Sequence, residues 1–372
     1  MLTTIRPSRP QHARLTMSEY VPPEIVDCLK ELETHYSDYE KNCRGASGYL
    51  WFAKNRVSLT EVAIKFYAGE SGDRRHDEPK LLAKIESPNI LPIYDARNVS
   101  NDWAYFVTPR CPGGDIDDLI RNQPSVHEAV DIVLGISHGV SAIHANGMVH
   151  RDLKPANIVL DGNTPRIADF GTVRVLNSGS NVTSASQHSV LYRPPESFTN
   201  NRYSRSGDVY QIGLVTYQLL GGTLPYDGRE FLSPRQRKSY EAIEDPIDQS
   251  LYVDDVIRQK AETGALLDCT SLPPWISASA KRALRQMTHP HPGQRFVSMA
   301  DVAAAMSKLR GTHQNWQFVG PVARLITTDR MIELRPTLSN RYEAFQQKSG
   351  TFRRIPGMEP STLADLVKRC AY

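Results

Sequence analysis

The chain has 372 residues, of which 40% are hydrophobic and 23% are charged, and its formal net charge is +3. This composition is typical of a soluble globular protein, and the length predicts one large two-lobed domain with flanking segments. So small a charge gives no argument for a nucleic-acid partner, and no apolar run approaches the length of a transmembrane helix. The five cysteines are scattered without CxxC spacing. They indicate free thiols in a reducing, cytoplasmic compartment.

The N-terminal segment, residues 1–35, is predicted to combine a leader with one short helix. Residues 1–15 carry three arginines and no acid, a faint transit-peptide pattern, but they lack a clear apolar face. We interpret them as a disordered or untranslated leader. Two prolines open the stretch from Pro22 to Thr34, where apolar residues recur at helical spacing. This helix is expected to pack on the following domain rather than to bind a partner.

From Tyr36 the pattern changes to strands. The turn Cys43-Arg44-Gly45-Ala46-Ser47-Gly48 is followed by Leu50-Trp51-Phe52-Ala53 and then by Val62-Ala63-Ile64-Lys65. Taken alone, these segments predict only a hairpin and a further strand. The next helix is expected to begin near Glu78, because Pro79 would break it at an interior position.

A strand, a loop and a long helix follow. Residues 103–108 are predicted to form the strand, and the Pro-Gly loop after it runs to Asp115. Ser125-Val126-His127-Glu128 has the form of a capping box. The apolar helix that it opens closes at Asn146-Gly147, so we interpret it as a buried structural element that delivers the chain to His150.

The segment His150-Arg151-Asp152-Leu153-Lys154-Pro155-Ala156-Asn157 precedes two short strands, which predict a hairpin, and then Asp169-Phe170-Gly171. A carboxylate at Asp152 can orient an attacking hydroxyl, and Lys154 can compensate the charge that develops on a phosphate. Asn157 and Asp169 offer hard oxygen ligands to Mg²⁺. This set of side chains suits metal-assisted phosphoryl transfer.

The rest of the large domain contains a polar loop and several helices. Thr172 to Ser189 is rich in hydroxyls and poor in apolar anchors, which predicts a mobile segment. Helices are expected from Asp208 to Leu220, from Trp275 to Met287 and from Ser298 to Leu309. Arg229 to Val253 is polar and is expected to decorate the surface.

The tail, residues 311–372, has nine Lys and Arg against five Asp and Glu. Strands are predicted at Trp316–Val319, Ala323–Ile326 and Met331–Leu334, and a helix at Ser361–Cys370. The excess of positive charge fits an acidic partner or a membrane surface. A small αβ appendage docked on the preceding domain is the interpretation that we prefer.

From Tyr36 to Arg310, the order and spacing of these segments resemble the serine/threonine protein kinases. The resemblance implies that Lys65 binds the α- and β-phosphates of ATP and pairs with Glu78, for which Asp77 is the substitute. Cys43 stands at the place of the family's first glycine, a departure from the pattern. The other residues that the resemblance places around the nucleotide are Gly45, Gly48, Leu50, Ala63, Asp115 and Val159.

The same resemblance assigns roles in the large lobe. Asp152 and Lys154 are implied to be catalytic, and Asn157 and Asp169 to hold Mg²⁺. His150 and Phe170 are implied to pack in the family's regulatory spine.

Three further roles follow from the resemblance. Ser189 would bridge the catalytic Asp and Lys, Glu196 would pair with Arg295, and Asp208 would tether the backbone of the catalytic loop. Pro194 replaces the usual Ala of the family's Ala-Pro-Glu, which is a tolerable change.

Arg151 implies regulation by a phosphate on the polar loop, because a guanidinium can pair with a phosphoryl group and order the loop. Thr183, Ser184 and Ser186 are the candidate acceptors, and the sequence does not choose among them. A polar linker that is never modified is the alternative.

The expected fold is α+β: a bilobal protein kinase fold with a small antiparallel-sheet lobe at about 36–108 and a large helical lobe at about 112–310. The expected function is transfer of the γ-phosphoryl group of ATP to a Ser or Thr of a protein, including the enzyme's own activation loop. Two alternatives stay open. A pseudokinase or nucleotide-binding scaffold is supported by Cys43 and Pro79, and a small-molecule kinase is opposed by the segment 189–196. The spelling of the motifs is compatible with a bacterial eukaryotic-like kinase.

Overall fold

The computed structural model describes residues 21–42, 48–68, 77–176, 182–184, 190–347 and 350–370. The chain divides into two units, residues 1–75 with 94–109 and residues 76–93 with 110–372. The segment 76–93, which the sequence places in the small lobe, belongs to the second unit. Its Leu91 donates the backbone N–H to the Ile167 carbonyl at 3.0 Å, and Ile90 and Ile167 form a β-bridge.

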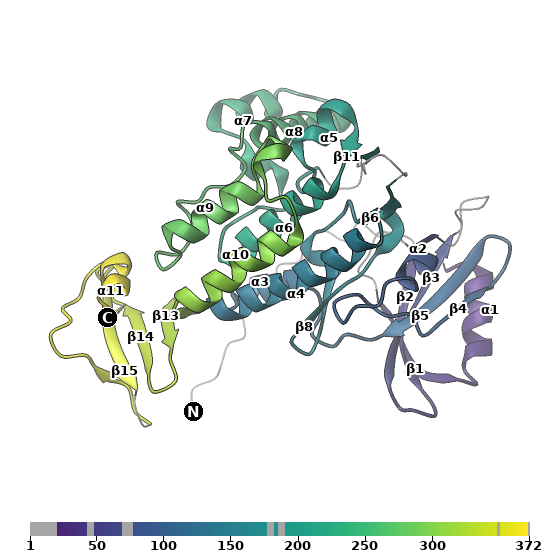
Figure 1. Ribbon diagram of the computed structural model, residues 1–372, viewed down its shortest axis with the longest axis horizontal. Helices are drawn as coiled ribbons and strands as arrows, with labels where there is room; N and C mark the ends of the chain where they lie inside the picture. The colour runs from purple at the N-terminus through teal and green to yellow at the C-terminus, as the bar shows by residue number, and fades with distance from the viewer. Residues whose placement is uncertain are drawn as a thin grey trace. The chain divides into compact units, whose positions relative to one another are not determined.

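The first unit is built on a five-stranded antiparallel sheet with the order β1-β2-β3-β5-β4. Its strands are β1 (Tyr36–Asn42), β2 (Tyr49–Asn55), β3 (Glu61–Ala68), β4 (Asp95–Asn98) and β5 (Trp103–Pro109). β2, β3 and β5 are rich in aromatic and β-branched residues, which suit a pleated, half-buried surface. The strands expected from Tyr36 onward are confirmed (Figure 1).

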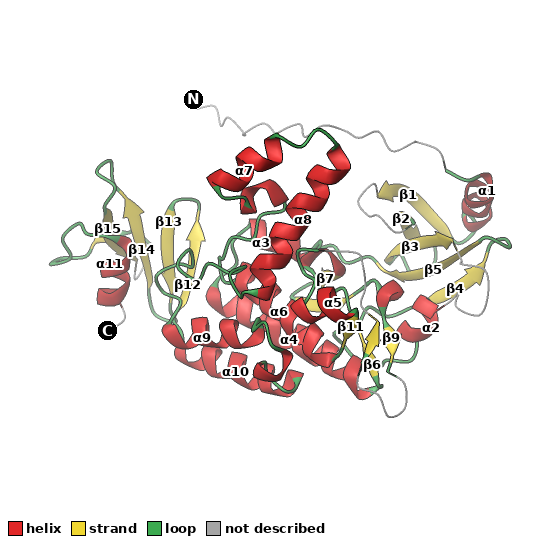
Figure 2. Cartoon of the chain, turned by 90° about the horizontal axis from the view of Figure 1, so that it is seen from above, coloured by secondary structure: helices red, strands yellow, loops and turns green. Residues whose placement is uncertain are grey.

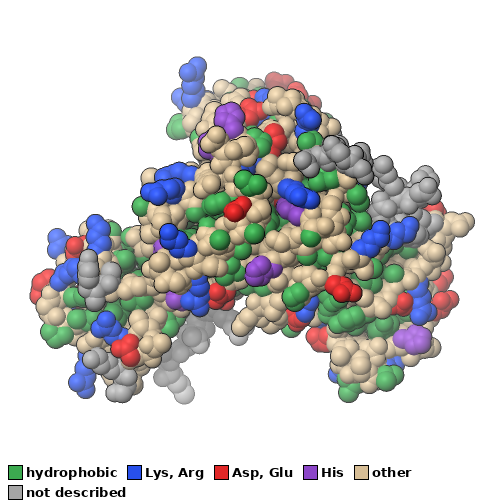
Figure 3. Space-filling model, in the orientation of Figure 1, with side chains coloured by type: hydrophobic (Ala, Val, Ile, Leu, Met, Phe, Trp, Pro, Cys, Tyr) green, Lys and Arg blue, Asp and Glu red, His purple; other side chains and the backbone are tan. Residues whose placement is uncertain are grey.

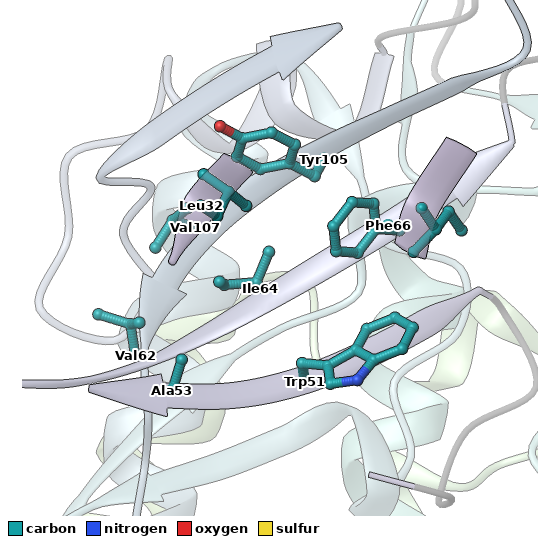
Figure 4. Packing of buried hydrophobic residues seen from close by; sticks show 9 residues of the cluster. Leu32, Trp51, Ala53, Val62, Ile64, Phe66, Tyr105 and Val107 are labelled. Atoms are coloured by element: carbon teal, nitrogen blue, oxygen red, sulfur yellow. The ribbon is translucent and has the colours of Figure 1, made fainter. Parts of the chain in front are cut away.

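Helix α1 (Pro23–Leu32) covers one face of this sheet. Its Ile25 and Leu32 are buried in the same cluster as side chains from β2, β3 and β5 (Figure 4). The strand residues of the cluster are Trp51, Ala53, Val62, Ile64, Phe66, Tyr105 and Val107. They occupy alternate positions on each strand, so they share one face. Each large apolar side chain buried here stabilises the unit by roughly 1.5–3 kcal/mol, which is enough to hold α1 on the sheet.

The opposite face of the sheet carries residues that the sequence assigns to the nucleotide. Leu50 lies opposite Lys65 in the β2–β3 ladder, and Ala63 lies opposite Thr108 in the β3–β5 ladder. Residues paired across a ladder share a face, and they alternate with buried neighbours such as Ile64. Leu50, Ala63 and Lys65 therefore lie together on the face that α1 does not cover.

The second unit is mainly helical. Its longer helices are α2 (Asp77–Leu82), α3 (Ile116–Arg121), α4 (Val126–Ala145), α5 (Pro195–Asn200), α6 (Arg205–Leu219), α7 (Pro234–Glu241), α8 (Pro246–Glu262), α9 (Ala278–Met287) and α10 (Met299–Thr312). Short 3₁₀ helices are η1 (Pro155–Asn157), η2 (Phe170–Thr172), η3 (Gly228–Phe231) and η4 (Pro292–Gln294). Three two-stranded ladders pair β6 (Met148–Val149) with β9 (Arg174–Val175), β7 (Ile158–Asp161) with β8 (Thr164–Ile167), and β10 (Thr183–Ser184) with β11 (Arg202–Tyr203).

Several local predictions are confirmed in this unit. Helix α2 begins at Asp77, which leaves Pro79 in the first turn, where its missing N–H costs nothing. Ser125 and Glu128 form the complete capping box of α4, and Gly147 takes a positive φ of 70° after its end. The polar stretch from Arg229 to Val253 is largely exposed, as expected for a surface decoration, and α7 and the first half of α8 lie within it.

Among the described residues, α4 is long and apolar enough to cross a membrane. However, 56% of its most apolar 18-residue stretch is buried inside the protein. Beside it, α6 is buried along almost its whole length, Gly207 to Leu219. These two helices pack together and form the core of the large lobe. The chain leaves the end of α4 directly toward the segment that begins with His150.

The C-terminal appendage, residues 315–370, forms a small sheet and one helix. The sheet is an antiparallel meander of β12 (Asn315–Val319), β13 (Val322–Ile326), β14 (Met331–Pro336), β15 (Tyr342–Gln347) and β16 (Arg353–Arg354). Helix α11 (Leu363–Cys370) packs against this sheet (Figure 2). The expected strands and helix are present, and β15 and β16 are additional strands that the sequence did not reveal.

The appendage docks on the large lobe through aromatic and polar contacts. The rings of Trp275 and Trp316 stack with centroids 5.4 Å apart, and Phe318 lies 4.7 Å from Trp275. His127, at the start of α4, donates its Nε2–H to the His313 carbonyl at 2.7 Å, while its backbone N–H donates to Asn315 Oδ1. The docked αβ appendage is the arrangement that the sequence favours.

Candidate active site

The catalytic-loop candidate, residues 150–157, starts after β6 and ends in η1. Asp152 is buried, and its carboxylate oxygen Oδ2 accepts hydrogen bonds from Lys154 Nζ at 2.9 Å and from Asn157 Nδ2 at 3.0 Å. The Asn157 amide also donates to the Asp152 carbonyl at 2.8 Å. Three of the four side chains singled out for phosphoryl transfer are thus brought together around one carboxylate.

The amide orientation of Asn157 bears on metal binding. Because its Nδ2 group donates to Asp152, its Oδ1 is the atom that can act as a hard ligand. Ala168, the residue before Asp169, donates its backbone N–H to the Asn157 carbonyl at 2.9 Å, which joins the two metal-ligand candidates across the β7–β8 hairpin. Asp169 adopts a left-handed conformation with φ 56°, and its Oδ1 accepts from the Gly171 N–H.

The described residues contain no cluster of three or more His, Cys, Asp or Glu that would hold a metal by itself. This donor set fits Mg²⁺ in the manner of nucleotide enzymes, where one or two protein oxygens act together with substrate phosphates. The oxygen chemistry of Asn157 and Asp169 is therefore compatible with the expected ion.

His150 is a packing residue with a fixed tautomer. Its Nδ1 accepts from the Asp152 N–H at 3.3 Å, so the proton lies on Nε2, which faces the Ala168 carbonyl at 3.2 Å. Burial lowers the pKa of its imidazole and keeps the ring neutral. The ring meets Phe170 edge to face, with centroids 5.4 Å apart. The two rings thus lie together in the core, as the sequence implied.

Asp208 tethers the catalytic loop from the first turn of α6. Its carboxylate accepts from the backbone N–H groups of His150 and Arg151, each at 3.0 Å, and lies 2.7 Å from His144 Nε2. Burial alone would raise the pKa of this carboxyl, but the hydrogen bond and charge of His144 outweigh it and hold the pKa below the usual range. The tether expected from the sequence is present.

Gln211 is a residue of this site that the sequence did not reveal. It is buried on α6, and its side chain bonds to the backbone of the catalytic loop at Arg151 and Leu153. Its position three residues after Asp208 puts both side chains on one face of the helix, and this is the signal from which it could have been found.

Arg151 is nearly buried beside a second cation. Its Nε donates to the Thr172 carbonyl at 2.6 Å, and the Thr172 hydroxyl donates to the His150 carbonyl at 2.7 Å. Burial, with a smaller contribution from Arg174, lowers the pKa of Arg151 to about 10. An anion placed near these two guanidinium groups would be stabilised, which is the chemistry that a phosphate switch requires.

Glu78 lies on α2, which packs against η2 within the second unit. A Cβ built on Gly171 would come within 4.0 Å of Glu78 Oε2, so the carboxylate lies near the Asp169-Phe170-Gly171 turn. In the first unit, Lys65 Nζ lies 5.7 Å from the centre of the Phe106 ring. The pairing of Lys65 with Glu78, or with Asp77, stays a prediction.

Asp115 and Val159, both assigned to the nucleotide, are brought together by a β-bridge. The Gly113 N–H donates to the Leu160 carbonyl at 3.2 Å, and a side chain on Gly113 would collide with Leu160. Asp115 also has a structural role, because its carboxylate caps α3 by accepting a hydrogen bond from the Asp118 N–H at 3.1 Å. Its contact with a ribose stays a prediction.

The segment after the polar loop is fixed by an ion pair. Arg295 donates from both terminal nitrogens to Glu196, at 2.9 and 2.7 Å, and this is the pair expected from the sequence. Thr183 pairs with Tyr203, and Ser184 with Arg202, in the β10–β11 ladder. Ser186, Ser189 and Gly45 lie outside the described residues.

A buried carboxylate bonded to Lys and Asn, with a second aspartate after a hairpin, is an arrangement that suits metal-assisted phosphoryl transfer. A model of the protein kinase domain matches residues 36–306. This match covers more than half of the chain, and the chain belongs to the protein kinase domain family. The bilobal α+β fold expected from the sequence is confirmed.

Several relatives are serine/threonine-protein kinases. The protein named ATG1a from Arabidopsis thaliana is 32% identical over 50% of this chain and 32% of its own length. The protein named drp72 from Corynebacterium efficiens is 26% identical over 72% of this chain and 49% of its own. PknA from Corynebacterium glutamicum is 26% identical over 72% and 54%, respectively. The chain thus spans about a third to a half of the length of these curated relatives.

Proposed function

We propose that this protein is a serine/threonine protein kinase that transfers the γ-phosphoryl group of ATP to a protein hydroxyl with Mg²⁺. The observation that carries the proposal is the Asp152 carboxylate, held by Lys154 and Asn157 within a loop whose backbone is bonded to Asp208. Such a carboxylate accepts or orients the proton of an attacking hydroxyl, a role that depends on fixed geometry.

The surrounding side chains supply charge and position. Lys154 offsets the negative charge that develops on the transferred group, and Lys65 binds the other phosphates. Asn157 Oδ1 and the Asp169 carboxylate would hold Mg²⁺, which would neutralise phosphate charge. Glu78 is the acid proposed to orient Lys65.

A protein substrate is supported by the segment that ends at Glu196. This segment is anchored by Arg295 at one end, and Tyr192 within it donates its hydroxyl to Gln218 at 2.7 Å. Small-molecule kinases have no need for such a platform. The names of the relatives above, all serine/threonine-protein kinases, support Ser or Thr as the acceptor.

Phosphorylation of the enzyme's own activation loop is the regulatory part of the proposal. Arg151 and Arg174 form a partly buried cationic pair, and Thr183 is the described candidate acceptor nearest along the chain to β9. A phosphate there would compensate both cations and order the loop.

An acidic partner for the C-terminal segment stays a prediction. Its central arginines, Arg324 and Arg335, are already bonded to Glu333. On the face shown in Figure 3, the Lys and Arg side chains of the appendage are interleaved with Asp and Glu instead of forming one patch. Docking on the large lobe accounts for this segment without a second partner.

The test is to incubate the protein with labelled ATP and Mg²⁺, with and without a generic Ser/Thr protein substrate, and to locate phosphate by mass spectrometry. The wild type is expected to label the substrate and the segment 183–189, and Asp152→Ala and Lys65→Met are expected to label neither. Asp248→Ala, an acid-to-alanine change at an exposed position of α8, is the matched control and is expected to behave like the wild type.

Each alternative has its own outcome in this experiment. Nucleotide binding without any phosphate transfer would support a pseudokinase or nucleotide-binding scaffold. Consumption of ATP that depends on a small hydroxylated compound, with no labelled protein, would support a small-molecule kinase. Labelling that survives Asp152→Ala would contradict the role proposed for Asp152.

A further inference from the structure

The buried side chain of Gln211 uses its whole hydrogen-bonding capacity. Its Oε1 accepts from the Leu153 N–H and from the Tyr203 hydroxyl, each at 2.8 Å. Its Nε2 donates to the carbonyls of Arg151 and Tyr192, each at 3.2 Å. A side-chain amide has two donor hydrogens and two acceptor lone pairs, so all four are engaged.

Two of these four bonds enclose Asp152. The Arg151 carbonyl and the Leu153 N–H belong to the peptide groups on either side of the Asp152 Cα atom. Fixing both peptide groups fixes the direction in which the Asp152 side chain leaves the backbone. Arg151 itself has a positive φ of 73°, a strained conformation that needs such support.

A third bond reaches the segment that the proposed function assigns to the protein substrate. Tyr192 lies four residues before Glu196, and its carbonyl accepts from the same Nε2 group that bonds to Arg151. One side chain therefore links the peptide backbone beside the proposed catalytic carboxylate to the backbone of the substrate segment.

The orientation of the amide is determined by its partners. A flipped amide would place its NH₂ group against the Leu153 N–H, donor against donor, and its oxygen against two carbonyls. Burial and the nearby Asp208 carboxylate raise the pKa of the Tyr203 hydroxyl, which keeps it a donor to this network. Neither Glu nor Met makes all four bonds, because Glu lacks the donor and Met lacks both functions.

We propose that Gln211 is a positioning residue, which couples the placement of the substrate segment at Tyr192 to the orientation of Asp152. This inference rests on the proposed function. Gln211 touches no reacting atom, and its effect passes through the backbone of Arg151, Leu153 and Tyr192.

The test compares three variants of the full chain in a peptide phosphorylation assay. Gln211→Met keeps the length of the side chain and removes all four bonds. Gln211→Glu retains the acceptor for Leu153 and Tyr203 and removes the two donated bonds. Thr216→Val is the matched control, because Thr216 is equally buried on α6 but its hydroxyl bonds only to the Ile212 carbonyl of the same helix.

A displaced catalytic group slows turnover without changing nucleotide binding. For Gln211→Met, kcat per folded molecule is expected to fall by about 10- to 100-fold while KM for ATP stays the same. Gln211→Glu is expected to raise KM for the peptide as well, because the bond to the Tyr192 carbonyl is lost. Thr216→Val is expected to keep both constants. The folded fraction of each variant is measured by nucleotide binding and thermal unfolding.

The inference fails if Gln211→Met, corrected for its folded fraction, has the kcat of the wild type. It also fails if kcat and stability fall together to the same extent in the Gln211 variants and in Thr216→Val, since that pattern indicates a purely structural role. If Gln211→Met does not fold, Tyr203→Phe is the substitute variant, and it removes the hydroxyl that bonds to Gln211 Oε1 and also to Asp208 Oδ1. It is expected to lower kcat by a smaller factor, and an unchanged kcat overturns the inference. A wild type without phosphoryl transfer would instead overturn the proposed function.

Discussion

Gly48 is a residue at which both backbone conformation and space exclude a side chain. Its φ is +112°, and a Cβ atom built on it would lie 2.3 Å from the Phe66 carbonyl oxygen. Gly48→Ala is therefore expected to lower the free energy of unfolding by about 1–3 kcal/mol through strain, and further because β3 must move. Urea-induced unfolding measures this loss.

Gly147→Ala is the matched control for this prediction. Gly147 also has a positive φ, +70°, but nothing lies within 4 Å of a built Cβ. Its substitution is expected to cost only the conformational penalty, about 1–2 kcal/mol. Equal losses in the two variants would show that the close approach of Gly48 to β3 is unimportant for stability.

The protonation of His150 is expected to make stability depend on pH. Burial lowers the pKa of this imidazole below its ordinary value of 6.5. As the pH falls through 6.5, this histidine binds a proton in the unfolded chain but not yet in the folded protein. The contribution of His150 to the free energy of unfolding is therefore complete above pH 6.5. Below that pH it decreases by at most about 1.4 kcal/mol per pH unit.

His150→Phe tests this dependence, because phenylalanine preserves an aromatic ring against Phe170 and does not titrate. The slope of unfolding free energy against pH, measured with urea below pH 6.5, is expected to be smaller in the variant. His313, whose pKa burial also lowers, accounts for part of the remaining slope. A slope identical to that of the wild type would mean that the His150 ring titrates as in the unfolded chain.

At the residue scale, the spacing of residues in the sequence was sufficient to predict the catalytic loop. It was insufficient to predict all the residues that hold the backbone of this loop. Asp152, Lys154 and Asn157 lie within one short segment, so their order in the sequence also determines which of them can meet. Gln211 meets Leu153 across 58 residues, and the only local sign of this contact is that Gln211 follows Asp208 by three residues on one helix. Asp208 could be predicted only because it belongs to a motif of the family.

Helix α1 makes a testable contribution to the small lobe. Ile25 is fully buried in the cluster on the covered face of the sheet, whereas its neighbour Val26 is 38% exposed. Ile25→Ala is expected to cost about 2–5 kcal/mol, because it removes buried apolar contacts and leaves a cavity. Val26→Ala, the control on the same helix, is expected to cost less than about 1 kcal/mol.

Amide hydrogen exchange in β1, β2 and β3 gives the readout for this pair of variants. Ile25→Ala is expected to accelerate exchange in these strands if α1 and the sheet unfold together. Rapid exchange confined to α1, with the strands still protected, would show that the helix is only an accessory to an independently stable sheet.

At the element scale, helices and strands with a strong apolar periodicity could be predicted from the sequence. Those with a weak periodicity could not. The capped helix α4 and the strands β2, β3 and β5 have clear apolar patterns and can be located from them, whereas β4, with the sequence Asp-Ala-Arg-Asn, was not predicted. Strand β15 has the sequence Tyr-Glu-Ala-Phe-Gln-Gln, in which only Ala344 is buried, and β16 has two exposed arginines. β15 is held by its pairing to β14, and β16 by its pairing to β15, which their side chains do not indicate.

The whole chain extends the protein kinase domain at both ends. The family match ends at residue 306, whereas the fold continues through β12 to α11 without leaving the second unit. The contact between Trp275 of the kinase domain and Trp316 of the appendage makes the two parts one packed structure. Cooperative unfolding of both parts is the consequence to test.

Trp275→Leu, Trp316→Leu and the double variant form a double-mutant cycle for this contact. The stacked rings, 5.4 Å apart, are expected to give a coupling energy of about 0.5–1.5 kcal/mol in a single unfolding transition. Trp275→Leu combined with Trp103→Leu, in the separate sheet unit, is the control and is expected to be additive within about 0.5 kcal/mol. A contact that transmits stability between two parts must make their mutations interdependent. Additive effects of the Trp275 and Trp316 changes, or a separate early transition for the appendage, would therefore show that residues 315–370 fold independently of the kinase domain.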